Sequence, residues 1–487
     1  MLASFTNLNC SEIPTIPVMC VTTFTIETQV PSTDLGDLLS FVQQYYVLAH
    51  PKAFRFTWKG TIDNTAVLSF RAFDQQRLWW IDIDVKAQKP IQVEMHPSIE
   101  MVQRETMETI NNDLVDTVRL FEEKVRKTTL YFAWVEGKDI IPEAMPSMKN
   151  RSLNRLFRSN MIFMYVISIA LSIVMFSVLG SYSMILIIAF QFAIVLVSNK
   201  IVLRLGNWRI DSKNPYVHLL QYDLPKDHFD EFRTKYDSDM ILRMKREIYA
   251  KTFSVGKEPT CELAGEVLSK YGFKCEPDRM LGRRVNVYDI VRSAAEKFRL
   301  PIPKIVISNT MLPNAAAAGP SPSHGTVLIT TGLLVQLEDD EILNVVGHEM
   351  GHLKGRDPLW LFGLMSLGYM LLLFLPSFTF SSFLYFFVVM SIVYFMAKFF
   401  ETRADLYSAV VIGQPQVLAE SLRKIAFRKL QLERMPQFRI QAWLMWDPHP
   451  PMYFRISRLE KMKPPVNVRH LLIQSAKDVF SGFRAAL

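Results

Sequence analysis

Four apolar runs, arranged as two pairs, limit what this chain can fold into. None of the four contains a charged residue, and they span residues 161–180, 182–198, 359–375 and 378–397. At a rise of about 1.5 Å per residue, helices of this length can cross a bilayer core of roughly 30 Å. Buried helices of a large soluble protein are the alternative, but long uncharged runs in pairs favour membrane spans. The sequence therefore predicts a multi-domain membrane protein with four transmembrane helices, as hairpins within 159–199 and 358–397.

Basic residues lie at the outer ends of both pairs, and no charge lies at either inner turn. Arg155 and Arg158 precede the first pair, Lys200 and Arg204 follow it, and Lys398 follows the second. Because positively charged flanks are enriched on the cytoplasmic side of a membrane, both ends of each hairpin are expected there. The N-terminus, the segment between the hairpins and the C-terminus are thus predicted to be cytoplasmic, in a multi-pass protein of the cell membrane.

The composition sets limits on partners and compartment. The 487 residues suffice for two or three domains, and 49% of them are hydrophobic. Basic residues beside the apolar runs explain the net charge of +8 better than nucleic-acid binding does. The four cysteines show no Cys-x-x-Cys spacing and cannot supply a multi-bridge framework, which favours a reducing compartment. The bilayer is one expected partner, nucleic acid is not, and the oligomeric state is left open.

Residues 1–150 have the pattern of a separate soluble α+β domain of unknown role. A short amphipathic helix near 35–45 precedes four strand-like segments, at 54–59, 66–73, 78–85 and 91–95. Pro97 and Ser98 then open a long helix whose apolar positions keep mostly three- and four-residue spacing as far as Val125. Because aromatic side chains are usually buried, three tryptophans are interpreted as core residues: Trp79, Trp80 and Trp134.

The segment between the hairpins, 205–357, contains Gly-His-Glu-Met-Gly-His at 347–352. His348 and His352 are four residues apart, so on a helix both rings lie on one face, where they can bind one Zn²⁺ at about 2.0–2.1 Å. Glu349 can then act as general base toward a water whose pKa the zinc lowers to about 7. A chance match on a structural helix is the alternative, since such motifs have false positives.

The surrounding residues favour a helix at this motif. The acidic residues 338–341 precede it, and carboxylates in a first turn match the positive end of the helix dipole. Glycines at 347, 351 and 355 would let another segment approach the backbone closely, although Gly355 alternatively ends the helix.

A third zinc ligand is required, because catalytic zinc usually takes three ligands from the protein. Glu401 and Asp405 lie one helical turn apart where the fourth apolar run ends, at the start of the segment 398–487. Since the hairpin returns the chain beside the zinc helix, Glu401 is predicted to be the third ligand. Asp405 is predicted to accept a hydrogen bond from the second ring nitrogen of a zinc histidine. The alternative for this pair is a charged helix end that extends to water.

Taken together, these motifs resemble one known family. In order, the chain has Gly-His-Glu-Met-Gly-His, an apolar hairpin, Glu-x-x-x-Asp, and then His449-Pro450-Pro451 with Arg455. This series of motifs resembles that of the HtpX-type membrane zinc metalloproteases, which are relatives of the CAAX prenyl proteases. The resemblance covers roughly residues 155–465, and the four-span layout matches the HtpX branch. It implies a mainly α, gluzincin-like protease domain with a small β-sheet, built from 205–357 and 398–487.

The resemblance also implies roles for individual residues. One Zn²⁺ per chain is bound by His348, His352 and Glu401, with Glu349 as the base and Asp405 as a supporting carboxylate. The segment Asn314, Ala315 and Ala316 binds substrate backbone as an added strand, with Ala316 where the family often has Phe. His449 steadies the oxyanion or, alternatively, forms a structural His-Pro-Pro turn. Arg455 pairs with Asp405 or with another carboxylate.

The predicted function is that of an integral-membrane zinc endopeptidase. The resemblance implies protein or peptide substrates, in particular damaged or misfolded membrane proteins cleaved on the cytoplasmic side, as in stress response and protein quality control. A prenylated-peptide protease of the CAAX type and a membrane scaffold or sensor with a vestigial zinc site are the alternatives. An intramembrane protease is a further rival, but polar sequence at 338–341 and 354–357 brackets the zinc motif and argues against it.

Overall fold

The chain divides into two compact units. The first comprises Met1–Tyr131, Leu220–Asp237 and Ala250–Gly282, and the second comprises Phe132–Leu219, Ser238–Tyr249 and Arg283–Leu487. The computed structural model describes residues 21–74, 78–99, 102, 104–126, 128–140, 174–175, 177–224, 238–273, 276–372, 380–433 and 436–487. The predicted basic flank Arg155 and Arg158, and most of the first predicted span, lie outside these residues. The domain limits expected from the sequence stay predictions.

An antiparallel five-stranded sheet forms the centre of the first unit. Its order is β1-β5-β4-β3-β2, with β1 Thr22–Ile26, β2 Phe54–Ile62, β3 Thr65–Phe73, β4 Trp80–Lys86 and β5 Ile91–Pro97. Ile83 pairs with Met95, and Asp84 pairs with Glu94. Because side chains alternate along a strand, the first pair faces the buried side and the second faces the other side. The sheet therefore has one apolar and one polar face.

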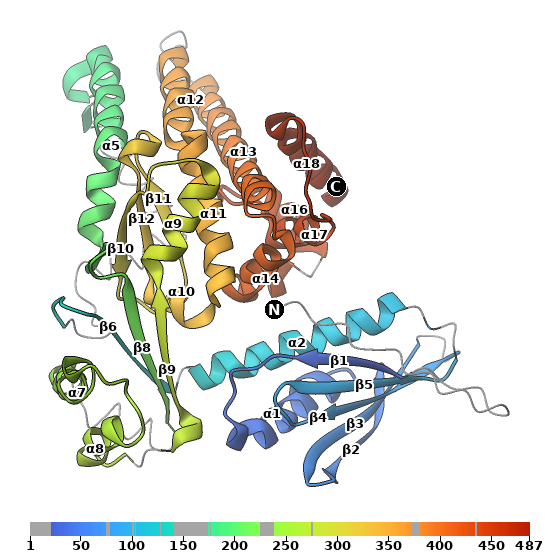
Figure 1. Cartoon of the computed structure of the whole chain (residues 1–487). Coiled ribbons are helices and arrows are strands. Elements are labelled where there is room, and N and C mark those ends of the chain that lie inside the picture. Colours follow the sequence, from blue (N-terminus) through green and yellow to red (C-terminus); the bar gives the residue numbers. More distant parts are fainter. Residues whose placement is uncertain are drawn as a thin grey trace. The chain divides into compact units, whose positions relative to one another are not determined.

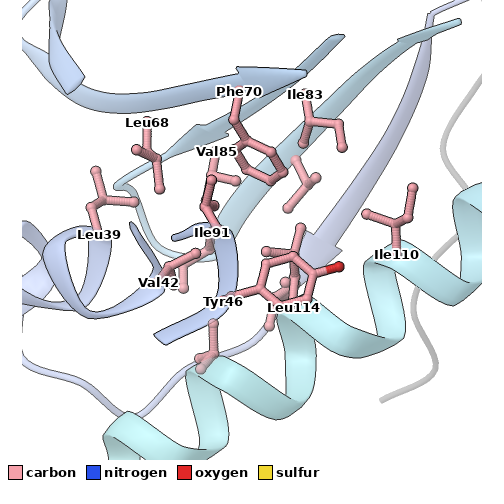
Figure 2. Packing of buried hydrophobic residues seen from close by; sticks show 14 of the residues in the cluster. Leu39, Val42, Tyr46, Leu68, Phe70, Ile83, Val85, Ile91, Ile110 and Leu114 are labelled. Atoms are coloured by element: carbon pink, nitrogen blue, oxygen red, sulfur yellow. The ribbon is translucent and has the colours of Figure 1, made fainter. Parts of the chain in front are cut away.

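Two helices cover the apolar face of this sheet. These are α1, Leu35–Val42, continued by a π-helical turn at Gln43–Val47, and α2, Arg104–Arg126. Figure 2 shows Phe70 and Ile83 of the sheet packed with Leu114 of α2. The strands agree with the sequence pattern, but α2 begins at Arg104 rather than at Ser98, because β5 continues through Pro97.

The three tryptophans interpreted as core residues differ in burial. Trp134 is 2% exposed, and Trp79 is partly buried against the core of the first unit. Trp80 is 39% exposed, so its assignment to the core is wrong. Its side chain lies on the polar face of the sheet, where the guanidinium of Arg71 lies 5.2 Å from the centre of its ring.

The first unit also contains a disulfide-bonded cysteine, Cys261, just before α8, Leu263–Lys270. The other three cysteines lie outside the described residues. The cysteine spacing favours a reducing compartment, in which Cys261 would be a free thiol, but the structure has Cys261 in a disulfide.

A four-stranded sheet positions the site in the second unit. Its order is β11-β12-β10-β7, with β7 Trp208–Ile210, β10 Lys304–Ser308, β11 Ala315–Ala318 and β12 Thr326–Thr330. β10 and β12 are parallel, and β12 is buried along its whole length, as its continuous apolar run predicts. β11 pairs antiparallel with β12 at one edge. Among the described residues, another sheet has the order β6-β8-β9, with β6 Thr129–Val135, β8 Tyr216–Asp223 and β9 Met280–Asn286.

Helices supply most of the second unit. They are α5 Ser183–Leu205, α9 Val287–Phe298, α10 Thr331–Gln336, α11 Asp339–Gly355, α12 Asp357–Leu372, α13 Phe380–Val411, α14 Pro415–Ile425, α15 Phe427–Glu433, α16 Pro436–Leu444, α17 Met452–Glu460 and α18 Leu471–Ala486. A further helix, α7 Ser238–Lys251, begins in the second unit and ends in the first. Figure 1 shows α5, α12 and α13 side by side, and the rings of Phe192 in α5 and Phe362 in α12 are 5.3 Å apart.

Only one helix in the described part of the chain, Ile185–Leu205, is long and apolar enough by itself to cross a membrane. α12 is described for 16 residues, and residues 373–379 after it lie outside the described part. The expectation of four spans is therefore not confirmed.

Candidate metallopeptidase site

The zinc motif lies on α11, and the residues around it explain why a helix forms there. Glu338 and Glu341 form a capping box, in which the backbone N–H of Glu338 donates to Oε2 of Glu341 at 2.8 Å. The helix ends at Gly355, and Arg356 takes the left-handed conformation after it, with φ of 52°. The sequence thus sets both ends of the element that carries His348 and His352.

Glycines let α13 approach α11 closely, as the sequence predicts. A Cβ at Gly351 would lie 3.0 Å from Cα of Ala404, and a Cβ at Gly347 would lie 2.7 Å from Cγ1 of Ile412. Any side chain at position 351 would therefore meet the backbone of α13. This contact allows Glu401, one turn before Ala404 on the same helix, to reach the histidines.

Potential ligand atoms of three residues converge between these two helices. Nε2 of His348 and Nε2 of His352 are 3.1 Å apart. Oε2 of Glu401 lies 3.5 Å from the first of these nitrogens, and Oε1 lies 3.3 Å from the second. The structure thus brings together the three residues that the sequence selects, in a group that could hold a metal ion.

A carboxylate faces the other nitrogen of each ring. Nδ1 of His348 lies 2.9 Å from Oδ1 of Asp405, and Nδ1 of His352 lies 2.7 Å from Oδ2 of Asp357. Each carboxylate favours a proton on Nδ1, which leaves the lone pair of Nε2 directed at the other ring. Two lone pairs at this separation repel each other unless a cation lies between them.

The donor set fits Zn²⁺. Oε2 of Glu401 is buried and makes no hydrogen bond in the described part of the chain, and its ion-pair partner, Nη1 of Arg455, lies 3.4 Å away. Two imidazole nitrogens and one carboxylate are a common protein ligand set for catalytic zinc. A cation at this place would remove the repulsion between the nitrogens and satisfy the carboxylate oxygen.

Asp405 is held by Arg455 of α17 in a fully buried pair. Nε of Arg455 donates to Oδ2 at 2.9 Å, and Nη2 donates to Oδ1 at 2.7 Å. Burial alone would raise the pKa of Asp405, but Arg455 and His348 outweigh it and hold this pKa well below its ordinary value. Asp405 therefore stays ionised and able to orient the ring of His348.

Asp357 has the matching role for His352, and sequence reasoning missed it. Its carboxylate also forms an ion pair with Arg403 of α13. The available signal was its position just after the zinc helix, five residues from His352. That spacing is not a helical one, because the chain turns at Arg356 between the two residues.

Glu349 faces the edge strand β11. The backbone N–H of Ala317 donates to Oε2 of Glu349 at 2.7 Å. This N–H points away from β12, and N–H and C=O groups alternate in direction along a strand. The main-chain groups of Ala315 and Ala317 therefore point to the open edge, and those of Ala316 point to β12.

The three residues predicted to bind substrate, Asn314, Ala315 and Ala316, differ in the direction of their main-chain groups. The backbone of Asn314 is tied to β12, because its N–H donates to Oγ1 of Thr330 at 2.9 Å. Ala315 lies at the start of β11, and Ala316 pairs with Leu328. Ala317, which the sequence analysis did not select, has the main-chain group nearest to Glu349.

His449 lies at the rim of the site and is half-exposed. Its Nε2 is 3.8 Å from Oε1 of Glu401, and its Nδ1 is 3.1 Å from Oδ1 of Asp447. Lys429 also contacts Asp447, with 2.6 Å between Nζ and Oδ2. Asp447 therefore turns Nε2 of His449 toward the ligand group.

A buried lysine fixes the loop that carries His449. Nζ of Lys398 donates to the backbone oxygens of Met445 and Asp447, at 2.9 and 2.7 Å. Burial lowers the pKa of Lys398 to about 8. Lys398 lies one turn before Glu401 on α13, so a single helix supplies a ligand and the anchor of this loop.

The site combines His348, His352 and Glu349 of α11 with Glu401 of α13. This is the set of residues that defines a metallopeptidase site. Residues 283–463 match the model of peptidase family M48. The chain is 34% identical over 207 residues to a protease HtpX homolog of Paenarthrobacter aurescens, covering 36% of this chain and 72% of that protein. It is 29% identical over 219 residues to the homolog of Tropheryma whipplei, covering 38% and 75%.

A third relative, the protease HtpX homolog of Thermodesulfovibrio yellowstonii, is 43% identical over 93 residues, 19% of this chain, and only 32% of that protein is covered. The crystal structure of S. mikatae Ste24p matches with a TM-score of 0.32 and 15% identity, covering 64% of each chain. The chain belongs to peptidase family M48 and is related to its HtpX metalloproteases, as the sequence motifs predict.

Proposed function

We propose that this chain is an integral-membrane, zinc-dependent endopeptidase that cleaves protein substrates at the cytoplasmic face. The observation that carries the proposal is the convergence of His348, His352 and Glu401 beside Glu349. Zinc held by these three residues would polarise a substrate carbonyl and lower the pKa of a bound water. The membership of a zinc-dependent peptidase family supports this assignment.

The residues of the chain itself have defined tasks in this proposal. Glu349 accepts a proton from the attacking water and passes it to the leaving amine. The open edge at Ala315 and Ala317 pairs with an extended substrate segment, so that main-chain hydrogen bonds orient the peptide bond. In its doubly protonated form, His449 keeps its Nδ1–H on Asp447 and donates a hydrogen bond from Nε2–H to the negatively charged oxygen of the intermediate.

Exposed apolar side chains support the membrane location. In α12, Leu367, Met370 and Leu371 are each about half exposed, and α13 has the same property at Leu384, Phe387, Val388 and Ile392. α5 contains the apolar span Ile185–Leu205. Because α12 contacts both neighbouring helices, these surfaces form one apolar belt, hereafter the belt, which lipid would cover.

The substrate class proposed is damaged or misfolded membrane proteins, at cytoplasmic loops or unfolded ends. An edge strand recognises backbone rather than a particular side chain, which suits varied unfolded segments. Ala316 and its alanine neighbours offer no large side chain of their own at this edge.

The test measures zinc content and cleavage of casein together on the detergent-purified chain. Glu349→Gln should retain zinc and lose cleavage by at least about a hundredfold, as expected for removal of a general base. The exposed Glu296→Gln on α9 is the matched control and should behave as wild type. Cleavage by Glu349→Gln at the wild-type rate would overturn the mechanism.

Two further results would point to other functions. Absence of zinc and of cleavage in the wild type would favour a scaffold. Cleavage of farnesylated peptides, with unmodified peptides and casein left intact, would favour a prenylated-peptide protease.

A further inference from the structure

The C-terminal helix α18, Leu471–Ala486, packs along α13 with one side only. Val479 is 1% exposed, and the ring of Phe483 lies 6.5 Å from that of Phe395 in α13. The acidic side chain of the helix, Asp478, is turned inward, where Nε of Arg458 donates to its Oδ2 at 2.6 Å. Figure 1 shows α18 beside α13.

An exposed side of α18 presents an alternating stripe of apolar and basic residues, hereafter the outer stripe. Its members recur at helical spacing, and they are Ile473, Lys477, Phe480, Arg484 and Leu487. The three apolar members are exposed by 55%, 62% and 77% of their surface. Since Asp478 pairs inward, the charged side chains of the stripe are both basic. Most of these residues line a shallow hollow on the surface.

The outer stripe continues onto the belt. The ring of Phe480 lies 5.4 Å from that of Phe395, which falls within the predicted span 378–397. Trp446, just after α16, stacks 6.1 Å from Tyr394 and lies 5.5 Å from Phe387, both on α13. Tryptophan is enriched where a membrane protein crosses from the apolar core to the headgroups. The contact between Phe480 and Phe395 places α18 beside the end of the predicted span, at the depth expected for the headgroups.

We infer that α18 lies in the headgroup layer of the bilayer and binds anionic lipid through the outer stripe. The apolar members enter the acyl boundary, and Lys477 and Arg484 extend their charged ends to the lipid phosphates. A helix with one apolar side and only positive charge beside it matches an anionic membrane surface. The inference rests on the membrane location in the proposed function and adds a lipid class and a second contact surface.

The charge of the outer stripe sets how strongly α18 should prefer anionic lipid over neutral lipid. Each basic residue near an anionic surface favours binding by about fivefold, so the pair contributes on the order of 30-fold. Lys461 and Lys463 lie beyond α17, off the stripe, and give a matched pair of charges for comparison.

The experiment uses the full chain, with Glu349→Gln to prevent self-cleavage, in nanodiscs containing photoactivatable lipid. Phosphatidylserine and phosphatidylcholine probes are compared, and the labelled peptides are identified by mass spectrometry. We expect both probes to label 359–372 and 384–397, and the phosphatidylserine probe to label 471–487 preferentially. Lys477→Gln with Arg484→Gln should reduce that preference by about 30-fold, whereas Lys461→Gln with Lys463→Gln should not change it.

The outcomes separate this inference from the proposed function. Labelling of 359–372 without labelling of 471–487 would overturn the inference and leave the membrane location intact. Equal labelling of α18 by both lipids, unchanged in the double variant, would overturn the assignment to anionic lipid. Cross-linking of α18 to a second copy of the chain, in place of lipid, would overturn it as well. Absence of lipid label from every apolar helix would refute the membrane location on which it rests.

Discussion

Replacing Arg455 with methionine removes the partner of a buried carboxylate. Arg455 is 3% exposed and Asp405 is fully buried, and two hydrogen bonds of 2.9 and 2.7 Å join them. Without the guanidinium, Asp405 keeps His348 at 2.9 Å, and Glu401 loses an ion-pair contact of 3.4 Å with Nη1 of Arg455. Methionine preserves much of the side-chain volume, so the change acts mainly on charge and hydrogen bonding.

The expected loss follows from burial. Breaking a buried ion pair by removing one partner costs about 3–5 kcal/mol, because an unpaired charge remains in the interior. The orientation of His348 also relies on Asp405, and loss of such support typically weakens metal binding about 10–100-fold. Arg455→Met should therefore lower both the stability of the metal-free protein and its affinity for zinc.

The assay compares thermal unfolding in detergent at one scan rate, with chelator present, and zinc affinity by competition with a chromophoric chelator. A fall in Tm on the order of 10 °C is expected for Arg455→Met. Arg423→Met is the control, because its partners Glu460 and Glu420 are 45% and 33% exposed and such pairs contribute about 0–1 kcal/mol. Equal Tm values for the two variants would refute the reasoning, as would unchanged zinc affinity in Arg455→Met.

Three further predictions concern the same centre. Gly351→Ala should destabilise the chain by about 1–3 kcal/mol and weaken zinc binding, because the added Cβ meets the backbone of α13. Gly363→Ala, whose Cβ meets open space, should do neither, and equal unfolding midpoints in the two variants would contradict the prediction. Asp447→Ala should lower kcat about 10-fold or more with zinc content unchanged, since His449 loses its orienting contact at 3.1 Å; a wild-type kcat would show that the contact is dispensable. Below about pH 5, where His348 is already protonated, the stabilising effect of Asp405, measured against Asp405→Asn in metal-free protein, should shrink as pH falls. The pKa of Asp405 is lowered in the folded state, so its stabilisation is present above the unfolded pKa and is lost as pH falls toward the folded one; a difference that grows below about pH 5 would have the wrong sign.

Local periodicity was sufficient to predict the elements that carry the site. Acidic residues before an apolar repeat predict α11, and one-turn spacing places Glu401 and Asp405 on one face of a helix. The glycines at 347 and 351 predict the close approach of another segment, which the structure shows to be α13. These inferences succeed because they rest on helix geometry, which depends on residues close together in the sequence.

The groups that the sequence analysis missed are set by long-range geometry. Ala317 contacts Glu349 through its backbone, and no feature of an alanine run predicts which N–H points outward. Asp357 and Lys398 act through a turn and through main-chain oxygens, which leave no residue pattern. Trp80 was assigned to the core from its type alone, and its place in the alternation of β4 exposes it.

The close contact between α11 and α13 has a consequence for the biogenesis of the chain. Glu401 follows His348 by 53 residues, with the second predicted hairpin in between. A ribosome that has completed only α11 has produced two imidazoles and a base but neither the carboxylate ligand nor Arg455. The ligand set is therefore complete only once α13 has been synthesised and has packed against α11.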